Sequence, residues 1–303
     1  MLFTPGNNLR MIDKISRLET DAVILDLEDA VPILDKETAR IFIRDSISTD
    51  EKKGRDDPFP YLKANDGPYV YVRINSLQSN LYNDDLDYVV VKGLDGVVIP
   101  KSETKEDIAK IDKTLVKAEA KSRIKRGSIS LIPLIETAKG VVNVYDIAKS
   151  SERVVALGFG AVDFSADVKM QPSNSGIELL YPRSSISIAA HACGVQPIDT
   201  PWVNVQDTDG LIKDCETAKK LGFTGKLAIH PLQLNTINIA FSPSESEIGY
   251  AKKIVESFNK AAKSGVGAIS LNGKMIDYAS LRQAKEVLQL SKMIERKSRI
   301  LYK

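Results

Sequence analysis

The 303-residue sequence predicts an α/β fold, a (β/α)8 TIM barrel followed by a C-terminal helical extension. The main observation is alternation, because short apolar runs rich in β-branched residues recur and amphipathic stretches lie between them. Eight such runs fall within roughly the first 240 residues, close to the ~250 residues of a typical barrel. A doubly wound open sheet usually carries G-x-G-x-x-G after its first strand, and this sequence lacks that pattern. We therefore expect a barrel in residues 1–242 and an extension in 243–303.

Continuous apolar runs predict the parallel strands, since helices cover both faces of such strands. These runs are residues 1–5, 22–28, 69–75, 95–101, 129–136, 153–160, 194–199 and 226–231. Amphipathic periodicity predicts helices at residues 8–19, 35–48, 104–121, 138–149, 177–192 and 208–221. Residues 49–68 are polar and rich in turn-forming residues, which predicts a mobile insertion before the third strand.

The chain continues beyond the eighth predicted strand. A Pro-Ser pair at 243–244 predicts the start of a helix that runs to about residue 264. A Gly-rich turn at 264–270 and a last helix at 279–296 follow. This extension is too small for an independent domain, so we expect it to pack on the barrel or on a neighbouring subunit.

Composition excludes several classes of protein. The formal charge is only +2, from 42 basic and 40 acidic residues, and 43% of residues are hydrophobic, which excludes a disordered chain. Two cysteines are too few for a disulfide-stapled secreted module. No apolar run approaches the ~20 residues that span a bilayer, and the N-terminus lacks a signal-peptide pattern. We expect a cytoplasmic protein that binds a small molecule, with no nucleic acid and no membrane as partner.

Polar side chains stand where the predicted strands end, the edge at which barrel enzymes carry their active sites. They are Asp26, Glu28, Asp29, Arg73, Asn75, Lys101, Glu136, Asp163 and His230. Filling a hydrophobic core does not require charged residues at the strand ends, so their presence there indicates a functional site. His230 precedes a proline, and we expect it to pin a loop rather than to catalyse.

Glu136 and Asp163 form the clearest pair among these residues. They follow successive predicted strands, and neighbouring strands lie ~4.8 Å apart, so both carboxylates can reach one cation. Mg²⁺ is commonly held by one or two carboxylates, with water or substrate oxygens in its other positions. No thiolate or imidazole cluster accompanies the pair, which argues against zinc. Each acid could instead stabilise a helix N-terminus, but together beside Arg73 they favour a metal site.

Arg73 lies in an apolar strand, where a charge is costly unless it is paired. Its guanidinium can bind a substrate carboxylate, form an ion pair with Asp26 or Glu28, or do both. Asp26, Glu28 and Asp29 lie close together in LDLEDA, residues 25–30, and we expect them to surround the cation site behind its ligands. Some of these acids could instead cap the helix that follows.

Residues 3–14, FTPGNNLRMIDK, predict a strand, a turn and the start of a helix. Backbone amides in this segment, together with Arg10 and Lys14, could bind phosphate. For either side chain alone, a solvated helix face is the more common role.

Eight blocks occur in one order from end to end of the chain: FTPGNNLRMIDK (3–14), VILDLEDAV (23–31), VRIN (72–75), GVVIPKSE (96–103), IPLIETAKGV (132–141), FGAVDFSAD (159–167), KLAIHPLQL (226–234) and SLNGKMIDYASLRQA (270–284). Together they resemble the citrate lyase beta subunit family of Mg²⁺-dependent aldolase-like barrels, relatives of malyl-CoA and citramalyl-CoA lyases. The resemblance implies a carbon–carbon lyase that cleaves a 3-hydroxyacyl thioester of citryl-, citramalyl- or malyl-CoA type. Its products would be an acetyl thioester and a 2-oxo acid: oxaloacetate, pyruvate or glyoxylate.

The resemblance also implies roles for residues of the catalytic centre. Glu136 and Asp163 match the family's metal ligands, and Arg73 matches the arginine that holds the substrate. Asp277 matches a carboxylate that moves a proton at the acetyl carbon, often supplied by a neighbouring subunit. A homotrimer or hexamer is therefore expected.

The CoA-binding positions match less completely. Phe3 and Lys14 match residues that contact the CoA or pantetheine arm. Asn8 stands where malyl-CoA lyases have an arginine, and Arg10 is a candidate replacement. This difference leaves both CoA and an acyl-carrier protein open as thioester carriers.

Three other functions remain open at this point. The chain could be the beta subunit of a multi-subunit citrate lyase that acts on a citryl acyl-carrier protein. It could also run in the malate-synthase or thioesterase direction. A non-catalytic binding barrel is the least favoured, since a scaffold has no need for Arg73, Glu136, Asp163 and Asp277 together.

Overall fold

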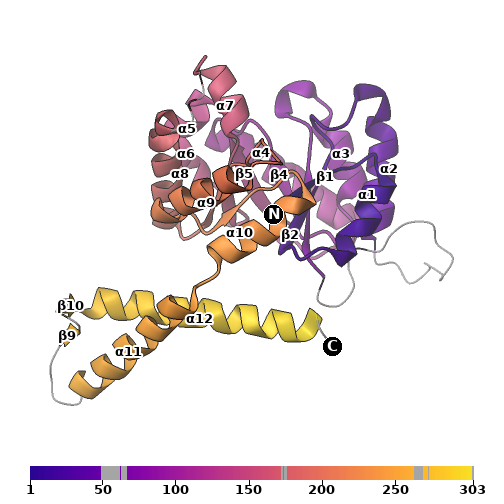
Figure 1. The fold of residues 1–303 in the computed structure, drawn as a ribbon. Helices are drawn as coiled ribbons and strands as arrows, with labels where there is room; N and C mark the ends of the chain where they lie inside the picture. Colours follow the sequence, from indigo (N-terminus) through magenta and orange to yellow (C-terminus); the bar gives the residue numbers. More distant parts are fainter. Residues whose placement is uncertain are drawn as a thin grey trace. The chain divides into compact units, whose positions relative to one another are not determined.

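The computed structural model describes residues 1–48, 62, 67–171, 173, 176–262, 269–271 and 273–301 (Figure 1). The chain forms two compact units, Met1–Ile237 and Asn238–Lys303. The predicted mobile insertion at 49–68 and the predicted turn at 264–270 lie largely outside the described residues.

The first unit is built on one sheet of eight parallel strands that follow sequence order. They are β1 (Leu2–Pro5), β2 (Ala22–Asp26), β3 (Tyr69–Arg73), β4 (Gly96–Ile99), β5 (Ser130–Ile135), β6 (Ala156–Phe159), β7 (Gln196–Asp199) and β8 (Gly225–Lys226). The sheet curls until its two edges meet: the amide of Phe3 donates to the Ala228 carbonyl and the amide of Ala228 donates to the Met1 carbonyl, both at 2.8 Å. The predicted (β/α)8 architecture is confirmed.

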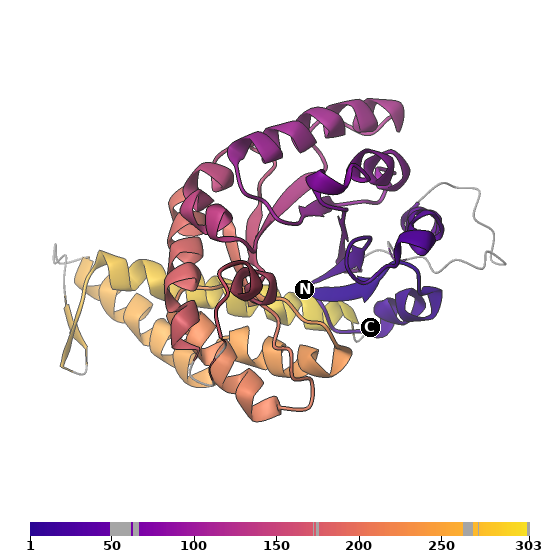
Figure 2. The same ribbon diagram turned by 90° about the horizontal axis from the view of Figure 1, so that it is seen from above.

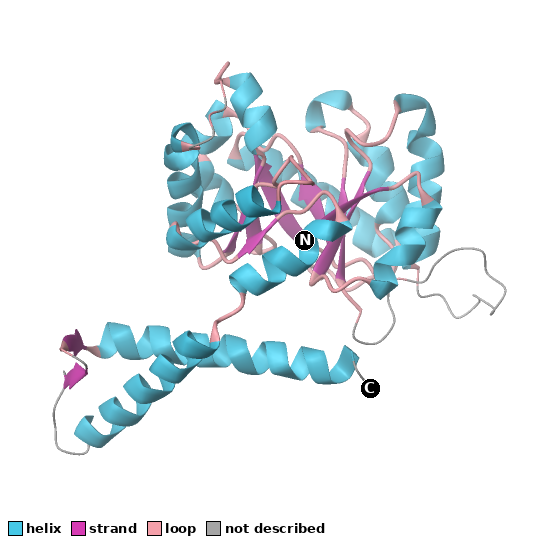
Figure 3. Cartoon of the chain, in the orientation of Figure 1, coloured by secondary structure: helices cyan, strands magenta, loops and turns pink. Residues whose placement is uncertain are grey.

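Helices surround this sheet, as the view from above shows (Figure 2). They are α1 (Leu9–Lys14), α2 (Lys36–Ile47), α3 (Tyr82–Val89), α4 (Lys105–Lys121), α5 (Ala138–Val142), α6 (Val144–Ala148), α7 (Ala161–Asp167), α8 (Leu180–Cys193), α9 (Thr208–Lys220) and α10 (Leu234–Phe241). Strands and helices alternate along the chain (Figure 3). The sequence pattern did not predict α3, α7 or α10.

Helix α3 escaped prediction because acidic residues obscure its apolar face. Its buried positions are Tyr82, Asp85, Leu86 and Val89, a regular helical stripe in which Asp85 occupies an interior place. Arg40 donates to Asp85 at 2.7 Å, and the amide and side chain of Asn75 donate to it at 2.7 and 2.8 Å. Asn75 therefore has a structural role here, since it holds α3 against the end of β3.

Alternate residues of the strands fill the barrel interior. The interior cluster is Ala22, Ile24, Tyr71, Val98, Ile132, Leu134, Ala156 and Leu227. Every residue of β2 and of β4 is buried, because the side chains that point away from the interior lie under the helices. This close packing fixes the strand ends, where the polar residues stand.

The second unit contains α11 (Glu245–Ala262), a hairpin of β9 (Ile269–Leu271) and β10 (Lys274–Ile276), and α12 (Tyr278–Leu301). Ala251, Ile254 and Phe258 of α11 form one buried cluster with residues of β10 and α12. The ring of Phe258 meets that of Tyr278 edge-on, with centroids 5.0 Å apart. The hairpin was not predicted, because its strands have only three residues each. No helix in the described part of the chain is both long and apolar enough to cross a membrane.

Candidate active site

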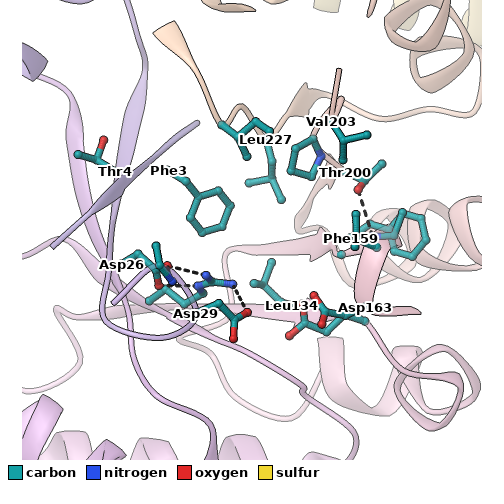
Figure 4. Close-up of a pocket in the computed structure, with 18 of the residues that line it drawn as sticks. Phe3, Thr4, Asp26, Asp29, Leu134, Phe159, Asp163, Thr200, Val203 and Leu227 are labelled. Atoms are coloured by element: carbon teal, nitrogen blue, oxygen red, sulfur yellow. Dashed lines mark hydrogen bonds and ion pairs between the residues drawn. The ribbon is translucent and has the colours of Figure 1, made fainter. Parts of the chain in front are cut away.

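A cavity of about 430 Å³ lies at the C-terminal ends of the barrel strands. Residues at or just beyond the ends of β1, β2, β3, β5, β6, β7 and β8 contribute to its lining. The cavity has two unlike sides: Asp26, Asp29 and Asp163 lie along one, and Val203 and Leu227 lie along the other (Figure 4). The arrangement offers charged ligands on one side and an apolar wall on the other.

Glu136 follows β5 and is only 2% exposed. Its Oε1 accepts a hydrogen bond of 2.6 Å from the backbone amide of Lys101. Gly160 lies against the other oxygen, since a Cβ built there would come within 2.5 Å of Oε2. Burial, together with the charges of Glu28 and Asp163, raises the pKa of Glu136 to about 8, although the Lys101 amide and Arg73 act in the opposite direction. A carboxyl in such surroundings is most readily ionised by a nearby cation.

Asp163 lies in the first turn of α7 and lines the same cavity. The start of α7 is held by Thr200, whose Oγ1 accepts from the amide of Ala161 at 3.1 Å. Thr200 directly follows β7 and was not predicted as a site residue. Its position after an apolar strand, like that of the acids, is the sequence signal that could have identified it.

Arg73 ends β3 and binds Asp26 through a two-pronged contact. Its Nε donates to Oδ1 at 2.7 Å and its Nη2 to Oδ2 at 2.6 Å. Asp26 also accepts from the amides of Glu28 and Ala30 at 2.9 and 3.0 Å, so it serves as ion-pair partner and as backbone cap together. Burial acts to lower the pKa of Arg73, but the hydrogen bonds to Asp26 and the charges of the nearby acids outweigh it. The pKa is therefore raised overall, and the guanidinium stays charged. The guanidinium carbon lies 4.9 Å from the ring centroid of Phe3, which also lines the cavity.

The remaining acids differ in burial. Glu28 is buried, and burial raises its pKa. Its Oε1 accepts from Lys101 Nζ at 2.8 Å, and its Oε2 lies 3.2 Å from Arg73 Nη1. Asp29 is exposed, with its Oδ2 at 3.6 Å from the same Arg73 nitrogen. The structure thus brings together Arg73, Lys101 and the three predicted acids.

Other predicted residues lie outside this cluster. Arg10 and Lys14 are exposed on α1, the short helix that follows β1. His230 Nδ1 accepts from the amide of Leu232 at 3.2 Å, which pins the turn after β8 as expected. Asp277 belongs to the second unit, where its Oδ1 accepts from the amide and hydroxyl of Ser280 at 2.9 Å each. Those bonds lower the pKa of Asp277, which caps the start of α12.

The donor set fits Mg²⁺. The site is not of the kind that holds a metal through three or more protein side chains, since no such group of His, Cys, Asp or Glu occurs among the described residues. Glu136 and Asp163 provide two carboxylates in one cavity, and Mg²⁺ is suited to few protein ligands with substrate or water oxygens in the remaining positions. The bare backbone of Gly160 leaves the space that the Glu136 carboxylate occupies.

Comparison with known proteins gives consistent results along the whole chain. The family model described as HpcH/HpaI aldolase/citrate lyase matches residues 1–231. The citrate lyase subunit beta of Haemophilus influenzae is 34% identical over 292 residues, which cover 96% of this chain and 96% of that protein. The mitochondrial citramalyl-CoA lyase of Homo sapiens is 32% identical over 308 residues, which cover 98% of this chain and 86% of that protein.

A solved structure shows the same similarity in three dimensions. The protein CitE from Mycobacterium tuberculosis, crystallised with magnesium, acetoacetate and coenzyme A, superposes with a TM-score of 0.75 at 26% sequence identity. The match covers 96% of this chain and 97% of the CitE chain, so it includes both units.

Proposed function

The chain belongs to the HpcH/HpaI aldolase/citrate lyase family, and on that basis we propose that it is a Mg²⁺-dependent carbon–carbon lyase of 3-hydroxyacyl thioesters. The predicted resemblance to citrate lyase beta subunits is confirmed. The enzyme cleaves a citryl-, citramalyl- or malyl-type CoA thioester into an acetyl thioester and a 2-oxo acid. The observation that carries this proposal is the cavity at the strand ends, where Glu136, Asp163 and Arg73 converge.

Each residue of the cavity has a distinct task in this reaction. Glu136 and Asp163 hold Mg²⁺, which when bound acts as a Lewis acid on the oxygens of the oxo-acid part of the substrate. Arg73, fixed by Asp26, binds the substrate and stabilises the negative charge that develops as the carbon–carbon bond breaks. The buried acids Asp26 and Glu28 keep Arg73 oriented and charged.

The remaining tasks concern the acetyl thioester. Asp277 moves a proton at the acetyl carbon. The bonds from Ser280 lower its pKa and favour the ionised form, so in the cleavage direction Asp277 first takes up a proton and then passes it to the acetyl carbon. Phe3 contacts the thioester arm from within the cavity, and Arg10 and Lys14 bind phosphate groups at the surface of α1. In the cleavage direction the 3-hydroxyl group gives up one proton to a base as the carbon–carbon bond breaks, and the acetyl carbon gains one proton through Asp277, so the reaction releases no net proton.

A second candidate is the beta-subunit role in a multi-subunit citrate lyase with an acyl-carrier protein. The similarity to citrate lyase subunit beta favours it, and so does Asn8, which caps α1 where an arginine would face CoA. CoA and an acyl-carrier protein present different phosphates, so the cations on α1 bear on which carrier the chain binds.

Assembly and location belong to the same proposal. We propose a homotrimer or hexamer in which Asp277, carried by the separate second unit, serves the cavity of a neighbouring subunit. Light scattering after gel filtration measures the oligomer size. We also propose a cytoplasmic location, and the two free thiols, Cys193 and Cys215, are consistent with that reducing compartment. Cell fractionation tests the location.

The first test is a coupled cleavage assay with malyl-, citramalyl- and citryl-CoA in parallel, with EDTA as control. EDTA-sensitive release of acetyl-CoA from one of them supports a free-standing lyase and identifies its substrate. If none of the three CoA thioesters is cleaved by a protein that still binds Mg²⁺ and an oxo acid, the result supports the subunit that depends on an acyl-carrier protein. If no thioester is cleaved and the protein does not bind Mg²⁺, the proposal is contradicted.

Glu136→Ala and Asp163→Ala are each expected to abolish the Mg²⁺-dependent activity while the protein stays folded. Either change removes one of only two carboxylates that hold the cation. Isothermal titration with Mg²⁺ and circular dichroism separate loss of metal from loss of fold. Normal turnover in either variant would show that the metal lies elsewhere.

A further inference from the structure

Lys101 has a strained backbone at a place where it touches the proposed metal site. It lies in the turn between β4 and α4, with φ of 47°, in the left-handed region. In this region the Cβ atom of an ordinary residue crowds the following carbonyl, which glycine avoids. Since glycine would fit this backbone better, the lysine side chain must provide something that glycine lacks.

The two halves of Lys101 contact two different acids. Its backbone amide donates to Glu136 Oε1 at 2.6 Å, and its ammonium donates to Glu28 Oε1 at 2.8 Å. Glu28 in turn lies 3.2 Å from Arg73 Nη1. Lys101 therefore connects the arginine proposed to bind substrate with the carboxylate proposed to bind metal.

The Glu136 carboxylate is confined from both sides. Gly160 borders Oε2 so closely that a Cβ there would lie 2.5 Å away, and the Lys101 amide holds Oε1. The residue after Lys101 is anchored as well, because the amide of Ser102 donates to the Leu134 carbonyl at 3.1 Å. Of the contacts around this turn, the ammonium bond to Glu28 is the one made by the lysine side chain itself.

We propose that Lys101 is a positioning residue of the metal site: its ammonium, tied to Glu28, holds the turn in the left-handed conformation that aims its amide at Glu136. The amide then fixes the Glu136 carboxylate in the orientation that accepts Mg²⁺. This inference rests on the proposed role of Glu136 as a metal ligand.

The proposal makes an unusual comparison of variants possible. Lys101→Ala removes the ammonium and leaves a residue that avoids the left-handed region, so the turn relaxes and the amide leaves Glu136. Lys101→Gly also removes the ammonium, but glycine adopts this conformation without steric cost, so the amide stays. Lys101→Arg keeps a cation for Glu28.

The measurement is the Mg²⁺ dissociation constant of the metal-free protein by isothermal titration. Lys101→Ala is expected to raise it by at least about tenfold, and Lys101→Gly and Lys101→Arg are expected to stay within about threefold of wild type. Arg123→Ala is the matched control, since Arg123 has φ of 55°, is exposed and follows α4 in another turn. That control is expected to leave the constant unchanged.

Each outcome is decisive. Equal loss in the alanine and glycine variants would mean that the charge of the ammonium acts directly, which overturns the proposal. Equal binding in all Lys101 variants would overturn it too, while absence of Mg²⁺ binding in wild type would overturn the proposed function itself. If Lys101→Ala does not fold, the pair Lys101→Asn and Lys101→Met replaces it, because asparagine tolerates the left-handed region and methionine does not.

Discussion

At the scale of single residues, Glu136 shows how burial prepares a ligand for a cation. The carboxyl is almost inaccessible, and desolvation holds its pKa near 8 instead of 4.5. Without a cation it is therefore mostly protonated at neutral pH. The folded state binds this proton more tightly than the unfolded state, so the metal-free protein loses stability as pH rises from about 4.5 to about 8.

This titration predicts how Mg²⁺ binding depends on pH. The cation needs the ionised carboxylate, so affinity is expected to rise about tenfold per pH unit below pH 8 and to level off above it. Titrations at pH 7 in buffers of different ionisation enthalpy are expected to report the release of about one proton. An affinity that stays constant from pH 6 to pH 9 would contradict the assignment, with Glu136→Gln as the non-titrating control.

At the scale of elements, short loops between strands and helices determine the geometry of the site. Gly160 joins β6 to α7, and its missing side chain lets the Glu136 carboxylate lie beside that loop. Thr200 after β7 holds the start of the same helix. Neighbouring strand ends thus hold one another's functional residues in place.

Gly160→Ala is expected to weaken Mg²⁺ binding by at least about tenfold and to cost about 1–3 kcal/mol of stability. The added Cβ would lie 2.5 Å from Oε2 and 2.7 Å from Cβ of Glu136, so the ligand must move. Gly249→Ala is the control, because a Cβ there meets nothing within 4 Å in α11. That control is expected to add about 0.5–1 kcal/mol and to leave metal binding unchanged. Titration calorimetry and thermal denaturation measure both effects.

A second set of elements is joined by buried charges. Lys226 of β8 donates to Asp199 of β7 and to Asp214 of α9, and Arg183 of α8 donates to both acids. Two cations and two anions balance one another, and the group ties two strands to the two helices that cover them.

Removing one member of this group leaves an uncompensated buried charge. Lys226→Met is expected to lower the free energy of unfolding by about 3–5 kcal/mol, as measured by denaturant titration. Lys220→Met removes a lysine that is 79% exposed and is expected to change it by less than about 0.5 kcal/mol. Similar stability of the two variants would show that the buried group does not hold these elements together.

At the scale of the whole molecule, the two units divide the proposed chemistry. The cavity with Arg73, Glu136 and Asp163 belongs to the first unit, and Asp277 belongs to the second. If Asp277 serves a neighbouring subunit, the catalytic centre is complete only in the oligomer.

Mixing two inactive variants tests this division. Arg73→Ala and Asp277→Ala subunits, unfolded together and refolded at equal amounts, are expected to recover about a quarter of wild-type activity, because random assembly pairs an intact Arg73 with an intact neighbouring Asp277 in that fraction of sites. Each variant refolded alone is the control. No recovery in mixed oligomers, verified by differently tagged subunits, would place Asp277 in the cavity of its own chain.

The sequence by itself determined the barrel and the edge that carries its polar groups. Apolar runs report burial on both faces of a strand, and that information is local, so the first seven strands lie within their predicted runs. The eighth does not, because β8 (Gly225–Lys226) shares only Lys226 with the predicted run 226–231. The same local pattern showed that charged residues such as Glu136 and Arg73 end these strands. It failed at α3, where the buried Asp85 hides the helical stripe.

Tertiary structure alone decided which residues contact one another. Arg73 donates to Asp26, which lies 47 positions away in the sequence. The amide of Lys101 donates to Glu136, which lies 35 positions away. Thr200 and the buried group around Lys226 likewise join segments distant in the sequence. These choices depend on the closure and register of the barrel, which bring strand ends together to within a few ångströms, and no local pattern encodes that geometry.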